Sequence, residues 1–320
     1  MAAPSSGSVE RRAGGRPLVI EARLNEWALR DRNPHVPWSA EEIARDAHAC
    51  WRAGASIVHF HVRRDDGSPA HALERYARTI RLIRERCDIL VHPTIAGVVT
   101  PGTTERLAPL RALAADPTTR PDLVPMDMGS TNLDVFDAAA KRFRTLDKVY
   151  ANSIRALRQT AEVIHEHSMT PLLVAWTVPC LRTIDAFVEA GWLREPALVC
   201  IALTEGGILG GNPGTVEGLD AMLRFMPAGR AIEWSVCCRE GDLTEVARHA
   251  IGLGGHVSIG LGDYPYESLG RPTNAELVAR VAAMGERSGR PAASVAQTRA
   301  LLDPSGRAPL PFTTAEAERT

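Results

Sequence analysis

Two histidines in the segment Val58-His59-Phe60-His61-Val62 are the residues of this sequence whose types and spacing most clearly indicate chemistry. The segment is otherwise apolar, as a buried strand is, and alternate side chains of a strand point to opposite faces. His59 and His61 therefore share one face. Two imidazoles at one strand end supply half of a catalytic zinc site, which has three protein ligands and an open position. A pair of hydrogen-bonded core histidines is the structural alternative.

Carboxylates follow three other apolar runs, where they could complete such a site. Glu26, Glu205 and Asp263 come after the first, sixth and eighth runs. Each could be a metal ligand or a general base, although Glu26 and Glu205 could also be solvated loop residues, and an Asp is common at a helix cap. We predict Asp263 and Glu26 as the catalytic residues.

Polar residues near the same strand ends are candidates for substrate binding. Ser130 and Asn132 lie in the loop Gly129-Ser-Thr-Asn132 after the fourth run. Their hydroxyl and amide groups suit an anion or a carbonyl, and they equally suit a helix N-terminus before Leu133. His92, in the third run, could face either the site or the surrounding helices.

Eight short apolar runs alternate with longer amphipathic stretches. The expected strands are Leu18–Leu24, Ser56–Val62, Ile89–Thr94, Leu123–Met128, Pro171–Trp176, Leu198–Leu203, Ile232–Val236 and His256–Leu261. The expected helices between and after them are Ala40–Arg52, Ala72–Arg86, Thr104–Ala114, Ile154–His167, Thr183–Ala190, Thr215–Phe225, Leu243–Leu253 and Ala275–Ser288. Three helix starts have the spacing of a capping box, namely Ser39–Glu42, Asp242–Glu245 and Thr273–Glu276.

Near-continuously apolar strands alternating with helices predict an α/β protein with a parallel sheet that is covered on its outside. Eight such units predict a (β/α)8 TIM barrel, with the site built from the loops that follow the strands. A doubly wound open sheet is the rival, but a Gly-rich phosphate loop would usually follow its first strand. Here Leu24-Asn-Glu-Trp27 follows instead. We expect a leader over 1–15, one barrel domain over 16–303 and a loose tail over 304–320.

Composition excludes several classes of protein. The chain is 45% hydrophobic and 23% charged, as globular proteins are, and no apolar stretch approaches the ~18 residues of a membrane span. A net charge of −1 leaves no electrostatic footprint for nucleic acid. Six cysteines without a C-x-x-C motif indicate reduced, buried thiols in a cytoplasmic protein. The only lysines, Lys141 and Lys148, fall outside the expected barrel, which disfavours Schiff-base chemistry.

Taken in order, these segments resemble the β-keto acid cleavage enzymes, the family described for 3-keto-5-aminohexanoate cleavage. The resemblance runs from about Arg16 to Leu302, and its strongest segments are Ile43–Gly67, Gly254–Asp263 and Thr273–Arg280. It implies a TIM barrel with one Zn²⁺ and a homo-oligomeric state. The implied reaction converts a β-keto acid and acetyl-CoA into acetoacetate and a new acyl-CoA, by enolate addition and retro-Claisen C–C cleavage.

The resemblance also implies roles for individual residues. His59 and His61 match the two zinc histidines, and Asp263 matches the Asp of a catalytic Arg–Asp pair. Thr94 falls where the family has a substrate-binding hydroxyl residue after the third strand. Ser130 and Asn132 fall in the loop motif after the fourth strand, so we predict all three as substrate-binding residues.

The chain departs from the family pattern at three places. Gly262 stands where the family has a Glu as third zinc ligand, and Ser258 stands where it has the Arg of the Arg–Asp pair. The family's acid in the fifth strand is missing at Trp176-Thr177. A water molecule or a different acid then completes the metal sphere, the candidate acids being Asp263, Glu205 and Glu26.

Two other functions are compatible with the same residues. A zinc hydrolase would use a metal-activated water, but such enzymes usually gather further histidines from strands five and six, and those runs contain none. A metal- or ligand-binding barrel without catalysis is the second, motivated by Gly262 and Ser258. For the acetyl-CoA reaction, arginines such as Arg63 or Arg239 could meet the CoA phosphates at the rim.

Overall fold

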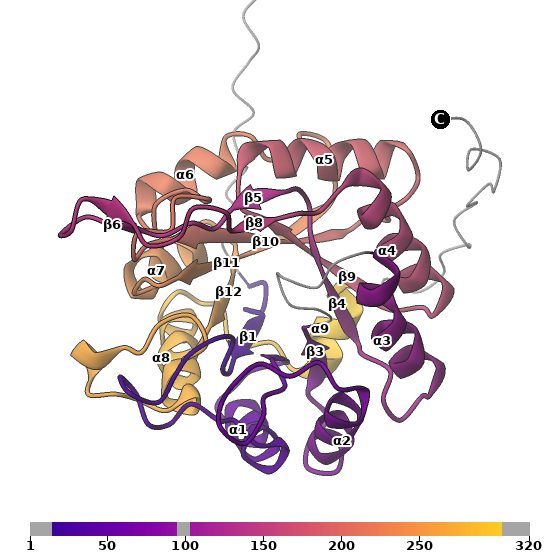
Figure 1. The fold of residues 1–320 in the computed structure, drawn as a ribbon, viewed down its shortest axis with the longest axis horizontal. Coiled ribbons are helices and arrows are strands. Elements are labelled where there is room, and N and C mark those ends of the chain that lie inside the picture. The colour runs from indigo at the N-terminus through magenta and orange to yellow at the C-terminus, as the bar shows by residue number, and fades with distance from the viewer. Residues whose placement is uncertain (1–14, 95–102, 303–320) are drawn as a thin grey trace, which may run out of the picture.

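A computed structural model describes residues 15–94 and 103–302 and shows one parallel, eight-stranded sheet that curls into a barrel (Figure 1). Its strands are β1 (Ile20–Arg23), β2 (Ile57–Phe60), β3 (Leu90–Pro93), β4 (Leu123–Asp127), β9 (Thr170–Ala175), β10 (Ala197–Thr204), β11 (Ile232–Arg239) and β12 (His256–Ile259). They lie in the order β3-β2-β1-β12-β11-β10-β9-β4. Between the two end strands, the Asp122 amide donates to the Val91 carbonyl at 2.9 Å, which brings β4 against β3. The predicted TIM barrel is confirmed, and each predicted run overlaps one of its strands.

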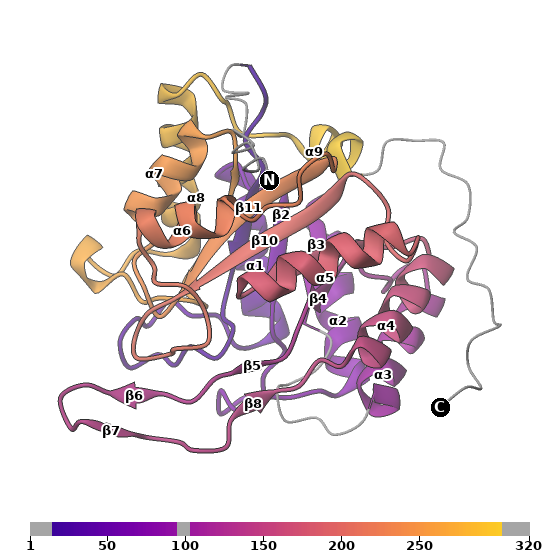
Figure 2. The ribbon, with the colours of Figure 1, turned by 90° about the horizontal axis from the view of Figure 1, so that it is seen from above.

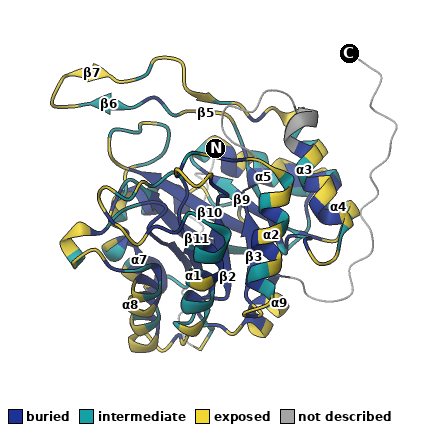
Figure 3. Ribbon diagram, turned by 60° about the horizontal axis from the view of Figure 1, so that its bottom comes forward, coloured by how far each residue is buried: buried dark blue, intermediate teal, exposed yellow. Residues whose placement is uncertain are grey.

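Helices surround this barrel and leave the strands buried (Figure 3). They are α1 (Ala40–Arg52), α2 (Leu73–Arg84), α3 (Thr103–Ala115), α4 (Ile154–Glu166), α5 (Val178–Glu189), α6 (Val216–Leu223), α7 (Thr244–Gly252) and α8 (Asn274–Arg287). Helix α5 begins five residues before the predicted start at Thr183, because Pro179 lies in its first turn, where its missing N–H is harmless. Among the described helices, none is long and apolar enough to cross a membrane.

Alternate residues of most of the barrel strands belong to two separate apolar clusters. In β2, Val58 and Phe60 pack in the larger cluster between sheet and helices, whereas Ile57 packs in a smaller one. The smaller cluster takes residues from seven strands or their edges and fills the interior of the barrel, its members including Val19, Ile57, Leu90, Leu123, Leu172, Leu198 and Cys237. Residues in phase with these point inward. The predicted common face of His59 and His61 is therefore the interior of the barrel.

A final helix, α9 (Val295–Leu302), closes the end of the barrel at which the strands begin. Val295 and Leu302 join the interior apolar cluster, and the Thr298 hydroxyl donates to the Ser56 hydroxyl at 2.8 Å. The predicted tail over 304–320 and most of the predicted leader over 1–15 lie outside the described residues. Because one end is plugged, a ligand can reach the interior from the C-terminal ends of the strands.

A long antiparallel arm leaves the barrel after β4 and extends beyond its rim (Figure 2). It is made of two short strand pairs, β5 (Thr131–Asn132) with β8 (Val149–Tyr150) and β6 (Phe136–Asp137) with β7 (Arg142–Phe143). The suggested helix start before Leu133 is therefore wrong, because Thr131–Asn132 form a strand. Lys141 and Lys148 lie on this arm, outside the barrel as expected.

Two of the three predicted capping boxes are present. Ser39 and Thr273 each accept from the amide of the Glu three residues on, and that Glu accepts from the cap amide in return. At Asp242 the prediction is wrong, because α7 starts one residue later, with Leu243 at its cap. The Asp242 carboxylate accepts from the Thr244 amide at 2.8 Å instead. All six cysteines are buried and free, as predicted.

Candidate functional site

His59 and His61 meet a carboxylate at the open end of the barrel. Nε2 of His59 lies 2.9 Å from Oε1 of Glu26, and Nε2 of His61 lies 2.6 Å from its Oε2. Glu26 lies in the loop between β1 and α1. It is close to the histidines because β1 is the neighbour of β2 in the sheet. All three side chains are buried, and together they form a group whose donor atoms could hold one metal ion.

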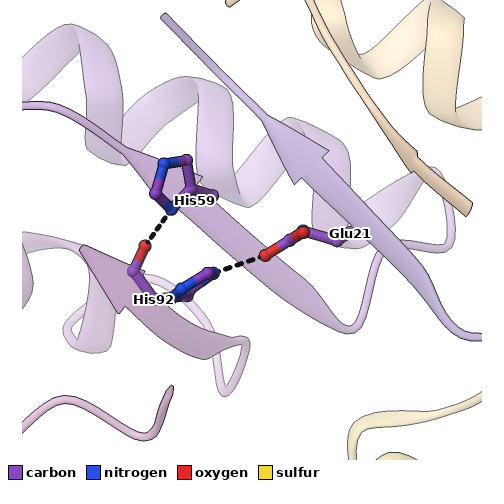
Figure 4. A group of neighbouring side chains, drawn as sticks. All are labelled: Glu21, His59 and His92. Carbon is purple, nitrogen blue, oxygen red and sulfur yellow. Dashed lines mark hydrogen bonds and ion pairs between the residues drawn. The ribbon is translucent and has the colours of Figure 1, made fainter. Parts of the chain in front are cut away.

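The hydrogen bonding of His59 favours a cation between these groups. Its Nδ1 lies 2.8 Å from the carbonyl oxygen of His92, and a carbonyl only accepts, so Nδ1 donates (Figure 4). In a neutral ring Nε2 then carries a lone pair, which points at another acceptor, the Glu26 carboxylate. A shared proton or a metal ion resolves that conflict. Fixing one ring nitrogen by a hydrogen bond is how proteins orient a metal-binding histidine.

Charge at the group also suits a divalent metal. Burial disfavours ionisation of Glu26, but the adjacent Arg23 guanidinium holds its pKa well below the usual range, so it is a carboxylate at neutral pH. Burial lowers the pKa of His61 to about 4, against the pull of Glu26, which leaves that ring neutral. Two imidazoles and one carboxylate are a known three-ligand set for catalytic zinc.

Gly262 leaves the space that Glu26 occupies. A Cβ atom on Gly262 would lie 2.6 Å from Cγ of Glu26 and 2.8 Å from its amide nitrogen, closer than real side chains approach. The space beside the position at which the family resemblance places a Glu ligand is therefore occupied by the side chain of Glu26, from the loop after β1. Of the three acids that could complete the metal sphere, Glu26 contacts both histidines. Glu205 is exposed, and its Oε1 accepts from the Gly214 amide at 2.9 Å.

Asp263 lies beside this group and is paired with Arg23, at the end of β1. Nε of Arg23 is 2.7 Å from Oδ2 of Asp263, and its NH2 also contacts the Glu26 carboxylate. Neither Asp263 oxygen accepts a well-aligned hydrogen bond from the described residues, although the side chain is buried. Burial raises the pKa of Asp263 to about 6, against the opposing effect of Arg23. Arg23 was not predicted as a site residue, although its inward orientation follows from its phase with Val19.

A second polar group lies on the side of His59 away from Glu26. Glu21 Oε1 is 2.6 Å from Nδ1 of His92 (Figure 4). The Ser258 hydroxyl donates to the other Glu21 oxygen. His92 therefore faces the interior, which settles the choice that the sequence left open. Glu21, His59 and His92 also have the spacing of a metal group. Because Nδ1 of His59 is already bonded to a carbonyl, we interpret this group as the support of the first one.

The remaining predicted residues differ in their placement. Thr94 is buried at the end of β3, on the same inward face as His92. Ser130 and Asn132 are exposed at the base of the arm, and no contact between them and the histidines is found among the described residues. Arg63 is 2% exposed and bonded to backbone carbonyls, so the suggested place at the rim is wrong for it.

Comparison with known proteins identifies the family to which the chain is similar. Residues 17–303 match the model of the family described as beta-keto acid cleavage enzyme. The chain is 28% identical to a 3-keto-5-aminohexanoate cleavage enzyme of Fusobacterium nucleatum, over 89% of this chain and 97% of the relative. It is 29% identical to a 3-oxoadipate:acetyl-CoA acetyltransferase of Cupriavidus necator, over 89% and 94%. A 3-dehydrocarnitine:acetyl-CoA trimethylamine transferase of Rhizobium meliloti is 26% identical, over 81% and 86%.

Among solved structures, the apo form of ObcA has a similar fold, with a TM-score of 0.68 at 15% identity. The alignment covers 84% of this chain and 65% of that longer chain. The match to the family model covers nearly all of the barrel, including both histidines, Glu26 and Asp263. The chain therefore belongs to the beta-keto acid cleavage enzyme family.

Proposed function

We propose that this protein cleaves a β-keto acid with acetyl-CoA at a zinc ion held by His59, His61 and Glu26. Membership of the family and the names of the relatives support the acetyl-CoA-dependent reaction. The observation that carries the metal is the Glu26 carboxylate, whose two oxygens lie 2.9 and 2.6 Å from the Nε2 atoms of the histidines. Around a zinc ion with bonds of about 2.0–2.2 Å, ligand atoms lie roughly 3–3.5 Å apart, so a small outward shift would admit the ion.

The proton acceptor in this proposal is Asp263. Its oxygens lack well-aligned hydrogen bonds from the described residues, and its raised pKa makes it a stronger base than an exposed Asp. Arg23 lies against it and stabilises the carboxylate between turnovers. Zinc, when bound, would supply a Lewis acid that polarises the keto group of the substrate.

In the proposed reaction, Asp263 holds one proton while the carbon–carbon bonds are exchanged. Asp263 takes a proton from C2 of the β-keto acid, the carbon between its ketone and carboxylate groups. C2 then forms a bond to the acetyl carbon of acetyl-CoA and displaces the thiolate. The thiolate adds to the original ketone carbon, C3, and the C2–C3 bond breaks. Asp263 returns its proton to C2, and the products are acetoacetate and a new acyl-CoA.

For the substrate, we keep Thr94, Ser130 and Asn132 as proposed contacts. Thr94 has support from its inward, buried position at the end of β3. The Ser130 hydroxyl oxygen already accepts from the Asn152 amide at 2.8 Å, and Oδ1 of Asn132 accepts from the Asp134 amide at 2.8 Å. These two residues would therefore contact a substrate through the remaining donors, the Ser130 O–H and the Asn132 NH₂.

The test combines metal content with product analysis. Purified protein is expected to hold about one zinc per chain, and a His59→Ala/His61→Ala variant none. Zinc-loaded protein is then incubated with acetyl-CoA and 3-keto-5-aminohexanoate, 3-oxoadipate or 3-dehydrocarnitine, and acyl-CoA products are identified by mass spectrometry. Acetoacetate that forms only with acetyl-CoA supports the proposal. Hydrolysis of a keto acid without acetyl-CoA would favour the zinc hydrolase. Zinc binding without turnover of any of these keto acids would favour the metal-binding barrel that lacks catalysis.

We also propose a homo-oligomer, as the family resemblance implies. Light scattering on the purified chain would test it, and a mass of one chain at micromolar concentration would contradict it.

A further inference from the structure

The backbone of Glu26 adopts a conformation that its residue type disfavours. Its φ is +29°, in the left-handed range that glycine accepts readily and other residues rarely adopt. No helix or strand includes Glu26, which lies in the loop after β1. Surrounding contacts must therefore hold the loop in the shape that directs this carboxylate at the histidines.

A buried arginine makes the most direct of these contacts. Arg63 follows His61 by two residues, and its NH2 donates to the carbonyl oxygens of Asn25, at 2.7 Å, and of Glu26. Its NH1 donates to the carbonyl of Gly67 at 2.7 Å. The side chain is 2% exposed, and no carboxylate of the described residues lies within 4.0 Å of it. Its NH2 group therefore bonds to the backbone of the loop that carries Glu26, and its NH1 group anchors the side chain to Gly67.

Asn25 joins the same loop to the histidine strand. Its side-chain oxygen accepts from the His61 amide at 2.8 Å, and its side-chain nitrogen donates to the His61 carbonyl at 2.9 Å. The same nitrogen donates to the carbonyl of Pro37 at 2.9 Å. Asn25 and the backbone carbonyl of Glu26 are therefore both hydrogen-bonded to the segment that carries His61 and Arg63.

We infer that Arg63 is a positioning residue for the metal site, holding the Glu26 backbone so that its carboxylate meets His59 and His61, while Gly262 keeps the path of that side chain open. This inference rests on the proposed zinc site. Residues that hold a ligand in place typically contribute 10–100-fold to metal affinity. Arg63 itself touches neither substrate nor metal in this role.

Zinc affinity tests the inference, measured by competition with a chromophoric chelator on purified, folded protein. Arg63→Met is expected to bind zinc 10–100-fold more weakly than wild type. Arg63→Lys keeps the charge but cannot span three carbonyls, so it is expected to fall between the two. The matched control is Arg290→Met. Like Arg63, Arg290 is buried, with 1% of its surface exposed. It donates to the carbonyls of Ile251 and Gly255 at the opposite end of the barrel.

A purely structural role for Arg63 would lower the melting temperature of both Met variants and leave both zinc affinities unchanged. That result would overturn the inference while the proposed function survives. A wild type that binds no zinc would overturn both. If Arg63→Met does not fold, Arg63→Lys decides, and an affinity equal to wild type would count against the inference.

Gly262→Ala provides a second, independent variant. Its added Cβ would meet Glu26 Cγ, so a comparable loss of zinc affinity is expected. The control is Gly252→Ala, in α7, where an added Cβ meets nothing within 4 Å. Unchanged zinc affinity in Gly262→Ala would contradict the inference that Gly262 keeps the Glu26 path open.

Discussion

At the residue scale, each buried carboxylate around the two histidines has a charged or hydrogen-bonding partner. Arg23 lies between Glu26 and Asp263, and Glu21 is shared by His92 and Ser258. A buried carboxylate without such a partner would be strongly disfavoured. Burial alone would favour a neutral Glu21, yet His92 and Arg23 lower its pKa to about 2. The site is thus a connected set of charges that β1, β2, β3 and β12 bring together.

The first prediction concerns moving the proposed ligand carboxylate from Glu26, in the loop after β1, to position 262, in the loop after β12. Glu26→Gly should lower zinc affinity at least about 100-fold, since one of three ligands is lost. In Glu26→Gly/Gly262→Glu, the aliphatic part of the new side chain would pass through the space that Glu26 leaves. A Cβ atom at position 262 lies only 2.6 Å from the place that Cγ of Glu26 occupies in wild type. Zinc binding should then return in part, as measured by chelator competition.

The control for this exchange is Glu26→Gly/Gly262→Ala, which restores bulk but no ligand. Equal zinc affinity in the Glu and Ala double variants would show that a carboxylate at Gly262 cannot replace Glu26.

A second prediction separates proton transfer from metal binding. Asp263→Asn keeps the shape of the side chain but removes its basicity, so kcat should fall about 10²–10⁴-fold. Zinc content should stay near that of wild type, because Asp263 does not contact the histidines. Metal analysis and steady-state kinetics on the same preparation measure both. Loss of zinc together with activity would assign Asp263 to the metal site instead.

Residue types and spacing were enough to find the histidine pair, because strand alternation fixes which side chains share a face. They were not enough to find Arg23. Its partner Asp263 is far away in the sequence, and the two meet only because β1 pairs with β12. Glu26 was named from its place after a strand, but its two contacts depend on a left-handed backbone that no local pattern indicates.

At the element scale, the strands and helices with clear periodicity were predicted well, and the arm was not. Each strand of the arm, β5 to β8, contains two residues, too few to show an alternating pattern. Its position depends on distant contacts instead, such as the Phe136 amide donating to the Gly207 carbonyl at 2.8 Å. At Asp242 the capping-box spacing was present, but the side chain formed a local turn with Thr244.

The third prediction concerns the junction of α1 and α8. Asn274, buried at the start of α8, donates to Asp46 of α1 at 2.7 Å and to the Leu24 carbonyl at 3.0 Å. Burial raises the pKa of Asp46 to about 7, and the hydrogen bond from Asn274 only partly offsets it. Between about pH 4 and pH 7 the unfolded chain therefore holds fewer protons here than the folded one. The Asp46 contribution to stability falls as pH rises through that window.

Asp46→Asn removes this titration and keeps an acceptor for Asn274. Relative to wild type, its free energy of unfolding should rise by roughly 1–2 kcal/mol between pH 5 and pH 8, measured by urea denaturation. Asp88→Asn is the control, because that side chain is 82% exposed. A constant difference between Asp46→Asn and wild type across this range would contradict the prediction.

At the scale of the whole molecule, one end of the barrel is closed by a helix, and the candidate site lies at the other end. Helix α9 and the interior apolar cluster fill the side where the strands begin. Glu26, His59, His61 and Asp263 gather where the strands end, on or after β1, β2 and β12, which adjoin one another in the sheet. A zinc ion at Glu26, His59 and His61 would join a β1 loop to β2, so metal binding and global stability should be linked.

The fourth prediction measures that linkage. Zinc binds the folded chain, whose ligands are assembled, in preference to the unfolded one. Free zinc at 100 times its Kd should therefore stabilise the protein by about 2.7 kcal/mol. For a chain of this size that corresponds to a rise in Tm of about 5 °C. Calorimetry on chelator-treated and zinc-loaded wild type gives the shift, with His59→Ala/His61→Ala as the control that should not respond. An equal shift in that variant would place the ion elsewhere on the molecule, whereas a shift confined to wild type locates the stabilisation at the mouth of the barrel.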